Sequence, residues 1–206
     1  CAGKKDIVII SSDHTRPVPS RVTMPILLHH IHSAAPEARV RILVATGMHR
    51  PSTHEELVNK YGEEIVANEE IVMHVATDDN MMKKIGTLPS GGECIINKIA
   101  ADCDLLLAEG FIEPHFFAGF SGSRKSVLPG IASYKTIMYN HNGQFVNDSH
   151  SRAGNLCHNH VSEDMFAAAE MAHLAFVLNV VLNGKHEVIG SFAATSTRHT
   201  RLAASS

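Results

Sequence analysis

Five short runs of apolar, mostly β-branched residues stand out along the chain. They cover residues 6–12, 39–46, 71–76, 93–99 and 104–108. Continuous apolar runs of this length are typical of strands that are buried on both faces of a parallel sheet. Three of the runs end abruptly, and loop-like residues begin at Asp13, Gly47 and Glu109. Each of these three is therefore expected to be a strand that runs into a loop.

Helical patterns separate these runs. They cover residues 23–33, 52–67, 133–140 and a stretch that begins at Ser162 and reaches residue 175. Pro25 is tolerable only in the first turn of its helix, and Ser52 with Glu55 has the spacing of a capping box. Strands that alternate with helices predict an α/β fold, in which helices cover both faces of a mainly parallel sheet.

Two further segments have different patterns. Residues 116–130 are rich in glycine and proline, so we expect an irregular loop that allows close approach of the backbone. Residues 176–182 and 186–192 flank Asn183-Gly184 and predict a β-hairpin. The polar tail, residues 195–206, is expected to be a helix end or a frayed terminus.

Composition narrows the class of protein. The chain has 206 residues, is 44% hydrophobic and 19% charged, and has a formal net charge of -3. A slight acidic excess without a basic stripe argues against nucleic-acid binding. No apolar run approaches the ~18 residues of a membrane span and no signal peptide is recognised, so a soluble, cytoplasmic protein is expected. Because the chain opens at Cys1 without methionine, we expect it to be a piece of a longer protein.

Chemically reactive side chains are concentrated in the loops that follow three of the strands. The first loop carries Asp13 and Arg16, the second His49 and Arg50, and the third Glu113 and His115. Ligands of parallel sheets bind beyond the carboxyl ends of the strands, so these residues are expected to gather at one site. Arginine offers a planar fork for a substrate carboxylate, and two opposed imidazoles can remove and return a proton on either face of a bound molecule.

Each of these residues also has a simpler interpretation. Asp13 is suited to cap the following helix, and Arg16 is suited to a surface ion pair with Asp13. A single histidine is more often a hydrogen-bonded structural residue than a catalyst. Among the 15 histidines, His29, His30 and His32 are interpreted as half-buried helix residues, and His158 with His160 gives only a weak indication of metal binding. None has the spacing of a structural zinc site.

The loop of residues 119–125 offers successive backbone N–H groups and ends in Arg124 and Lys125. Such a loop is suited to cradle a phosphate, although its glycine spacing does not match the nucleoside-triphosphatase motif. Lys125 is either a solvated charge or, in an apolar cleft, a nucleophilic amine that holds a cofactor covalently.

Several unusual segments occur together in one order. They are Asp13-x-Thr15-Arg16-Pro17, Gly47-x-His49-Arg50-Pro51, the run from Glu113 to Gly122, Lys125 followed by Leu128-Pro129-Gly130, and Asn140-His141. In this combination the chain resembles the nickel-pincer lactate racemase family. The resemblance implies a two-domain enzyme, in which residues 1–206 form the Rossmann-like N-terminal domain that binds the cofactor and carries catalytic residues. The C-terminal domain would be absent from this chain.

The resemblance also implies a cofactor and its ligands. Lys125 matches the lysine that bonds to a nicotinic-acid-derived, thiocarbonyl-bearing mononucleotide, which holds nickel through sulfur and a ring carbon. His141 matches the imidazole that completes the nickel coordination. Further positions that contact the cofactor are matched by Asp13, Thr15, Phe117 and Ser121.

The implied reaction is the racemisation of a 2-hydroxy acid. His49 and His115 match the two acid/base histidines, and Arg16 matches a residue that binds the substrate carboxylate. One histidine takes the hydroxyl proton while the Cα hydride moves to the cofactor ring, and return of the hydride to the opposite face inverts the centre. The resemblance further implies separate proteins that build the cofactor, and little activity for this chain without its C-terminal domain.

Other functions remain open at this point. The substrate is lactate, malate, or a longer or sugar-derived hydroxy acid, or belongs to another class in a homologue with the same fold. A non-catalytic nickel or cofactor carrier would need only Lys125 and His141. A metal-dependent hydrolase would use His49, His115 and a carboxylate such as Glu113, and would leave Lys125 without a role.

Overall fold

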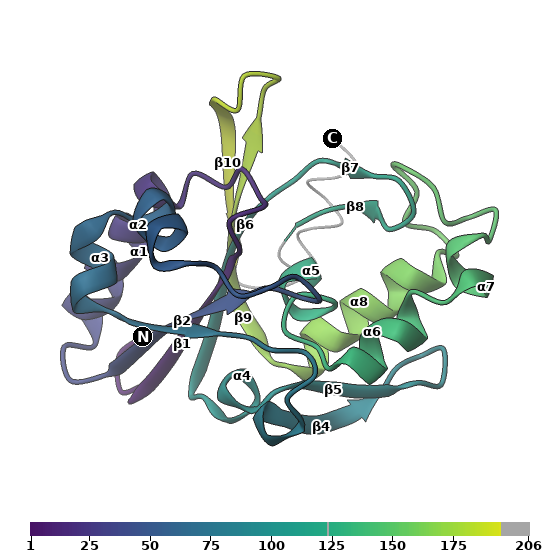
Figure 1. The fold of residues 1–206 in the computed structure, drawn as a ribbon, viewed down its shortest axis with the longest axis horizontal. Coiled ribbons are helices and arrows are strands. Elements are labelled where there is room, and N and C mark those ends of the chain that lie inside the picture. Colours follow the sequence, from purple (N-terminus) through teal and green to yellow (C-terminus); the bar gives the residue numbers. More distant parts are fainter. Residues whose placement is uncertain (123, 195–206) are drawn as a thin grey trace.

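The computed structural model describes residues 1–122 and 124–194. Within these residues the main sheet has six strands in the order β10-β9-β6-β1-β2-β3 (Figure 1). The strands are β1 (Asp6–Ser12), β2 (Arg39–Ala45), β3 (Glu70–Met73), β6 (Leu105–Phe111), β9 (Leu174–Leu182) and β10 (Val188–Ala194). Every neighbouring pair is parallel except β9 and β10. The predicted α/β fold with a mainly parallel, Rossmann-like sheet is confirmed.

The central strand β1 shows why the sheet is covered on both faces. Its residues from Ile7 to Ile10 are completely buried. Because side chains alternate along a strand, Ile7 and Ile9 pack in one core and Val8 and Ile10 pack in the other.

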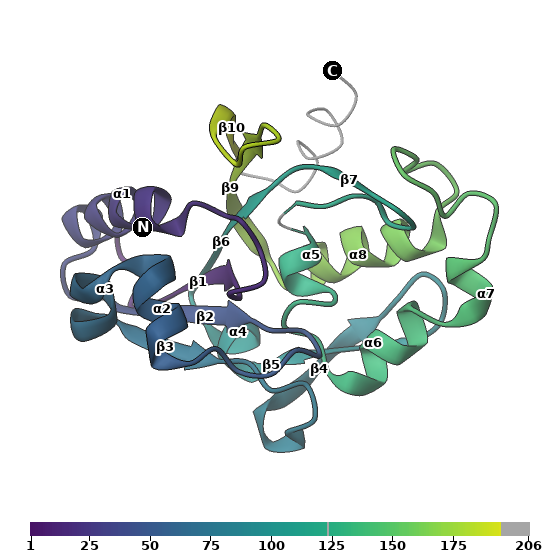
Figure 2. The same cartoon turned by 45° about the horizontal axis from the view of Figure 1, so that its top comes forward.

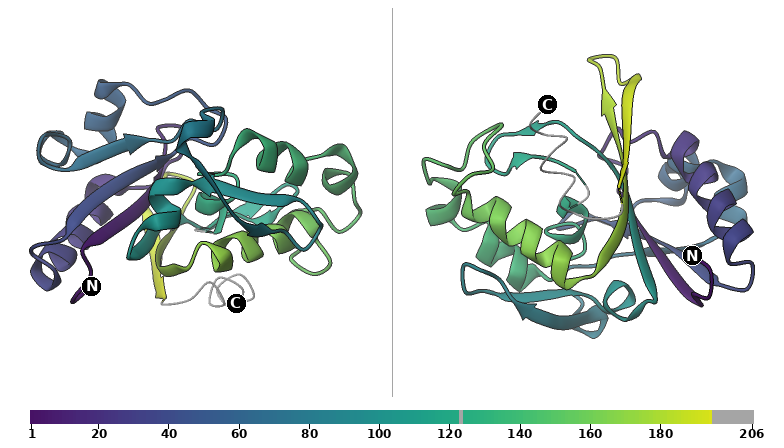
Figure 3. Two further views of the ribbon diagram at one scale, coloured as in Figure 1. Left: turned by 90° about the horizontal axis from the view of Figure 1, so that it is seen from below. Right: turned by 180° about the vertical axis from the view of Figure 1, so that it is seen from behind.

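Helices form the outer layers on the two faces of the sheet, as the view from behind shows (Figure 3). Those on the first face are α1 (Ser20–Ala34), α2 (His54–Tyr61) and α3 (Glu63–Asn68). Those of the opposite layer and its connections are α4 (Lys98–Asp102), α5 (Arg124–Val127), α6 (Tyr134–Asn140), α7 (Gly143–Val146) and α8 (His160–Met171).

Two small sheets lie outside the main sheet. They are built from β4 (Met82–Thr87) with β5 (Glu93–Asn97), and from β7 (Pro114–His115) with β8 (Gly119–Phe120). A short 3-10 helix, Asp79–Met81, precedes β4. The run at residues 93–99 is therefore a strand, as predicted, but it pairs with β4 and covers the core with Cys94 and Ile96. The partly exposed sequence of β4 gave no comparable signal.

The helix predicted over residues 52–67 differs in two ways. Its capping box is formed by Thr53 and Glu56, one residue later than predicted. It is also broken into α2 and α3 at Gly62, whose φ of 91° is outside the helical region. Helix α1 begins at Ser20, earlier than predicted, so Pro25 lies beyond the first turn.

Two other boundaries also differ. Helix α8 begins at His160, because the Asn159 side chain caps it by accepting a hydrogen bond from the Ser162 N–H, and it ends at Met171. The segment 116–130 is not wholly irregular, since it contains β8 and the short helix α5. Close backbone approach is nevertheless confirmed there. A Cβ added to Gly119 would lie 2.3 Å from the Asn155 carbonyl oxygen.

The predicted hairpin is confirmed as β9 and β10, which project from the main body (Figure 1). The prediction for the tail at residues 195–206 lies outside the described residues. Among the helices that are described, none has the length and apolar character needed to cross a bilayer.

Candidate active site

The sheet has its topological switch between β1 and β6, since the chain leaves these neighbouring strands toward opposite sides (Figure 2). A cavity of about 250 Å³ lies there, at the carboxyl ends of β1, β2 and β6. Its lining includes Asp13 and Arg16 after β1, His49 after β2, and Lys125 and His141 from the α5–α6 region. This is the place where open α/β sheets bind ligands. The expectation that separate loops meet at one edge is confirmed for Asp13, Arg16 and His49, whereas Arg50, Glu113 and His115 are not among the lining residues.

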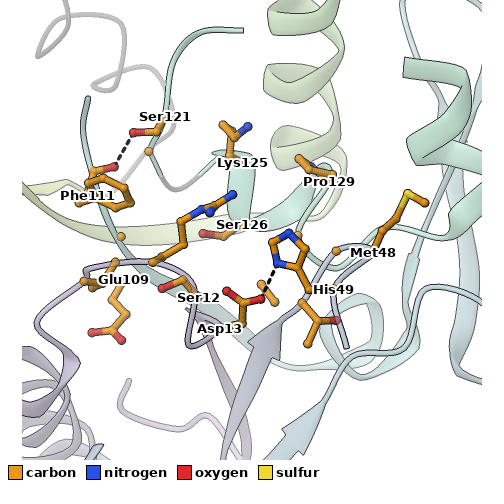
Figure 4. A pocket seen from close by; sticks show the side chains of 18 of the residues that line it. Ser12, Asp13, Met48, His49, Glu109, Phe111, Ser121, Lys125, Ser126 and Pro129 are labelled. Atoms are coloured by element: carbon orange, nitrogen blue, oxygen red, sulfur yellow. Dashed lines mark hydrogen bonds and ion pairs between the residues drawn. The ribbon is translucent and has the colours of Figure 1, made fainter. Parts of the chain in front are cut away.

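One group at the site, the Asp13 cluster, consists of the lining residues Asp13 and His49 together with Thr15, which bonds Asp13. Asp13 is only 1% exposed, and its Oδ1 accepts hydrogen bonds from the Thr15 backbone N–H (3.0 Å) and hydroxyl (2.6 Å). Its Oδ2 lies 2.6 Å from Nδ1 of His49 (Figure 4). The carboxylate thereby fixes the orientation of the imidazole and leaves its Nε2 for a ligand.

The electrostatics of Asp13 agree with this arrangement. Burial acts to raise the pKa of Asp13, but the hydrogen bonds from Thr15 and His49 outweigh it and hold the pKa below its ordinary value. The helix-cap alternative for Asp13 is wrong, because α1 has Pro19 at its N-cap and no side-chain cap. No ion pair joins Asp13 to Arg16 in the described part of the chain, and the Arg16 Nη1 donates to Thr15 Oγ1 at 3.2 Å.

A second group, the Lys125 cluster, consists of Lys125, His115, Phe117 and His141. Nζ of Lys125 lies 3.0 Å from Nε2 of His115, and Nδ1 of His115 accepts the Ala118 backbone N–H at 3.2 Å. The Phe117 ring contacts both imidazoles edge-on, with centroid distances of 4.6 Å to His115 and 5.1 Å to His141. Neither His115 nor Phe117 is among the residues that line the cavity.

Burial dominates the protonation of the Lys125 cluster. Burial, followed by the positive charges of Arg16 and Arg124, lowers the pKa of Lys125 to about 8. Burial and the Lys125 charge lower the pKa of His115 to about 3 and that of His141 to about 4. Both imidazoles are therefore neutral near pH 7, and about a tenth of the lysine is an uncharged amine at that pH.

His141 has an unusual environment. It follows the last residue of α6, and its buried Nδ1 has no hydrogen-bond partner among the described residues. A buried ring nitrogen without a partner costs free energy unless a ligand satisfies it. A neutral imidazole of this kind is suited to bind a transition metal such as nickel.

Other predicted residues lie less directly at the site. Ser121 lines the cavity, but its hydroxyl already bonds the Glu113 N–H and the Phe111 carbonyl oxygen, both at 2.9 Å. Arg50 is turned to Glu56, with which it forms a bidentate pair. Glu113 is exposed and is not among the lining residues.

Sequence analysis missed Glu109 at the base of the cavity. This carboxylate is 1% exposed and accepts hydrogen bonds from the hydroxyls of Ser11, Ser20 and Thr23, at 2.5 to 2.6 Å. It points away from Lys125 (Figure 4). The predicted strand ended at residue 108, whereas β6 continues to Phe111. The sequence signal that could have identified Glu109 was an acidic residue within a continuous apolar strand.

Arg124 was also missed as a structural residue. It is 1% exposed and donates to the backbone oxygens of Ala118, Phe120 and Ser121. Its guanidinium also lies over the Phe166 ring of α8, 4.6 Å from the centroid. These contacts hold the loop that precedes Lys125 against α8.

The remaining histidines do not add a metal site. His29, His30 and His32 are exposed rather than half-buried, because they lie on the outer side of α1. No group of three or more histidine, cysteine or acidic side chains in the described residues is arranged to hold a metal. His158 and His160 therefore belong to no such group.

Comparison with known proteins gives the family. The model of the lactate racemase N-terminal domain matches residues 1–154. A lactate racemase from Lactiplantibacillus plantarum is 71% identical over 191 residues, which are 93% of this chain and 45% of that protein. A lactate racemase from Thermoanaerobacterium thermosaccharolyticum is 54% identical over 196 residues, 95% of this chain and 46% of that protein. The chain thus spans about half the length of these relatives.

Solved structures give the same fold, and one of them is a lactate racemase. The structure of the lactate racemase apoprotein from Thermoanaerobacterium thermosaccharolyticum has a TM-score of 0.97 and 51% identity, covering 99% of this chain and 49% of that one. A protein from Thermotoga maritima has a TM-score of 0.79 at 21% identity, covering 99% of this chain and 53% of that one, and shows the fold alone. The fold and site are those of an α/β protein with a ligand cavity at its topological switch. The chain belongs to the lactate racemase family, as its motifs predicted.

Proposed function

We propose that this chain is the N-terminal, cofactor-binding half of a 2-hydroxy acid racemase with lactate as its substrate. The observation that carries this proposal is the pairing of two unlike groups at one cavity. Asp13 orients His49 on one side, and Lys125 supplies a buried amine on the other (Figure 4). Named relatives at 71% and 54% identity support lactate as the substrate.

His49 is proposed as an acid/base that acts on the substrate hydroxyl. Its Nδ1 is held by Asp13 at 2.6 Å, so Nε2 is the nitrogen available to take a proton. The buried carboxylate then stabilises the imidazolium that forms. This arrangement lets His49 accept a proton without moving.

His115 is proposed as the second acid/base. Its Nδ1 accepts the Ala118 N–H at 3.2 Å and its Nε2 lies 3.0 Å from Nζ of Lys125, so both ring nitrogens have partners in this chain. Two bases are required because the hydroxyl lies on a different side in each enantiomer. Occupation of Lys125 by a covalent cofactor would release the Nε2 of His115 from its present contact.

Arg16 is proposed to bind the substrate carboxylate. Only one of its guanidinium N–H groups has an acceptor among the described residues, namely Thr15 Oγ1. The remaining donors are suited to a bidentate bond with a carboxylate at the cavity. Asp13, Thr15 and the edge of Phe117 are proposed to contact the cofactor, and Ser121 is proposed to do so through the loop that its hydroxyl stabilises.

The residues fit a lysine-linked nickel-pincer nucleotide. Lys125 has the lowered pKa that a nucleophilic amine needs, and His141 has a buried nitrogen without a partner. When bound, this group would supply a ring that accepts the Cα hydride, which no side chain can do. The surrounding Phe117 and His115 would exclude water from it. Cofactor-building proteins and a C-terminal half are the partners that this proposal requires.

The alternatives receive less support. A hydrolase would need His49, His115 and Glu113 to converge on a metal, and these residues form no such group in the described structure. A cofactor carrier would have no use for the Asp13–His49 pair at 2.6 Å.

The test is intact mass and nickel content of the full-length protein, produced together with the cofactor-building proteins. The unsubstituted protein is expected to carry a modified mononucleotide and nickel, and Lys125→Ala is expected to lose both. Lys185→Ala, an exposed lysine of the hairpin turn, is the matched control and should retain both. Absence of adduct and nickel from the unsubstituted protein would reject the proposal.

A further inference from the structure

A second cavity, which we call the Lys60 cavity, lies between α2 and the loop after β1. It has a volume of about 320 Å³ and is lined by His14, Arg16, Val18, Glu56, Asn59 and Lys60. Arg16 and Val18 also line the main cavity, so the two spaces are neighbours. None of the roles described above involves Lys60.

Lys60 is poorly paired for a partly buried lysine. Its Nζ donates one hydrogen bond, to Ser12 Oγ at 3.2 Å, and lies 5.8 Å from the centroid of the Tyr61 ring, but Lys60 forms no ion pair in the described part of the chain. Burial lowers the pKa of Lys60, although the more distant carboxylates of Glu109 and Asp13 act to raise it. An ammonium group withdrawn from water without a counter-ion is costly, and a bound anion would remove that cost.

The nearby carboxylates are already occupied. Glu56, the one acid that lines the Lys60 cavity, forms a bidentate pair with Arg50 and accepts the Thr53 N–H. Asp13 is bonded by Thr15 and His49, and Glu109 is bonded by three hydroxyls. The positive charges of Lys60 and Arg16 therefore face the Lys60 cavity without a carboxylate bonded to either.

We propose that the Lys60 cavity is an oxyanion subsite, in which Lys60 and Arg16 together bind a carboxylate or phosphate group. Arg16 offers a planar fork and Lys60 a compact charge, which is a common combination for such groups. Asn59 adds a polar side chain at the rim. The subsite extends the role proposed for Arg16. It rests on the proposed function in one respect only, namely the identity of the ligand that carries the oxyanion.

The test measures binding of inorganic phosphate and, separately, L-lactate to the cofactor-free full-length protein, by ligand-observed NMR titration at low ionic strength. Lys60→Met is expected to weaken binding by about tenfold or more, because a charge-assisted hydrogen bond is lost. Lys60→Arg keeps the charge and should bind within about threefold of the unsubstituted protein. Lys185→Met is the matched control and should have no effect.

A second variant covers the case in which Lys60→Met fails to fold. Asn59→Glu places a carboxylate at an exposed position of the same cavity and should weaken oxyanion binding by about tenfold through repulsion and competition for Lys60. Weakening for phosphate alone identifies a phosphate subsite, and weakening for lactate alone identifies a carboxylate subsite.

Two results would overturn the subsite. One is unchanged binding of both anions in Asn59→Glu and in folded Lys60→Met, which would leave Lys60 as a purely structural charge. The other is absence of binding to the unsubstituted protein. Neither depends on nickel or on the Lys125 adduct, so failure of the subsite is distinguishable from failure of the proposed racemase function.

Discussion

The Asp13 cluster and the Lys125 cluster differ in how their polar atoms are paired. Both Asp13 oxygens are bonded within the chain, and the pKa of Asp13 is lowered because those bonds outweigh the effect of burial. In the Lys125 cluster, burial lowers the pKa of every ionisable member, and His141 Nδ1 has no partner among the described residues. The polar atoms of Asp13 are thus paired within the chain, whereas the Lys125 cluster leaves a buried ring nitrogen unpaired among the described residues.

This difference indicates how the two sides contribute. The proton transfer proposed for His49 would start from a fixed geometry, because the bonds of the Asp13 cluster already exist. The Lys125 cluster holds neutral nitrogens in an apolar environment, which costs stability until something binds them. Four measurements would sharpen or break the comparison.

The largest expected effect is on activity. Asp13→Asn preserves shape but removes the charge that stabilises protonated His49, so the racemisation rate of the cofactor-loaded full-length protein should fall by about 10²–10⁴-fold. Asp104→Asn is the control, because Asp104 accepts only the Lys5 and Asp6 N–H groups at the opposite end of β1. A fall of less than about threefold in Asp13→Asn would separate Asp13 from the chemistry.

The next effect is on stability. Glu109→Ala removes the acceptor of three buried hydroxyls and should lower the free energy of unfolding by about 2–4 kcal/mol. Glu170→Ala, at an exposed position of α8, should change it by no more than about 0.5 kcal/mol. Urea unfolding measures both. Equal effects of the two substitutions would show that the hydroxyl shell does not support the cavity.

A smaller effect concerns amine reactivity and its pH dependence. With a pKa of about 8, Lys125 is about half neutral at pH 8, whereas an ordinary lysine near 10.4 is less than about 1% neutral. A small acylating reagent should therefore modify Lys125 about tenfold faster than exposed Lys185 at pH 8. The rate for Lys125 should level off above that pH. Peptide mass spectrometry follows both, and equal rates would contradict the lowered pKa.

The smallest effect compares two buried histidines in the cofactor-free protein. His141→Leu should leave the free energy of unfolding unchanged or raise it by up to about 1 kcal/mol, because it removes an unpaired polar group. His74→Leu should lower it by about 2 kcal/mol, since Nε2 of His74 bonds the Ala132 carbonyl oxygen and its Nδ1 bonds the Asn97 amide. A comparable loss in both would mean that His141 has a partner within the protein.

The amino-acid sequence by itself determined the sheet and the family. Buried runs such as residues 6–12 and 39–46 have no stable place except inside a covered parallel sheet, and loops after such strands must share one edge. That physical constraint is enough to place Asp13, Arg16 and His49 near one another. The same constraint was applied to Glu113 and His115, but neither lines the cavity, and Lys125 and His141 were assigned only by motif.

Tertiary structure decided which side chains became hydrogen-bond partners and which were removed from water. Ser52 and Thr53 are both suited to cap a helix, so the sequence alone does not show which of them does so. The break at Gly62 likewise depends on the backbone angles that this glycine adopts in the fold. Glu109 became the acceptor of Ser11, Ser20 and Thr23 only because β6 lies beside β1 and beneath α1. The lowered pKa of Lys125 likewise arises from burial and from distant Arg16. Local sequence fixes the type of each side chain, but hydrogen bonds and desolvation depend on which distant residues the fold brings into contact.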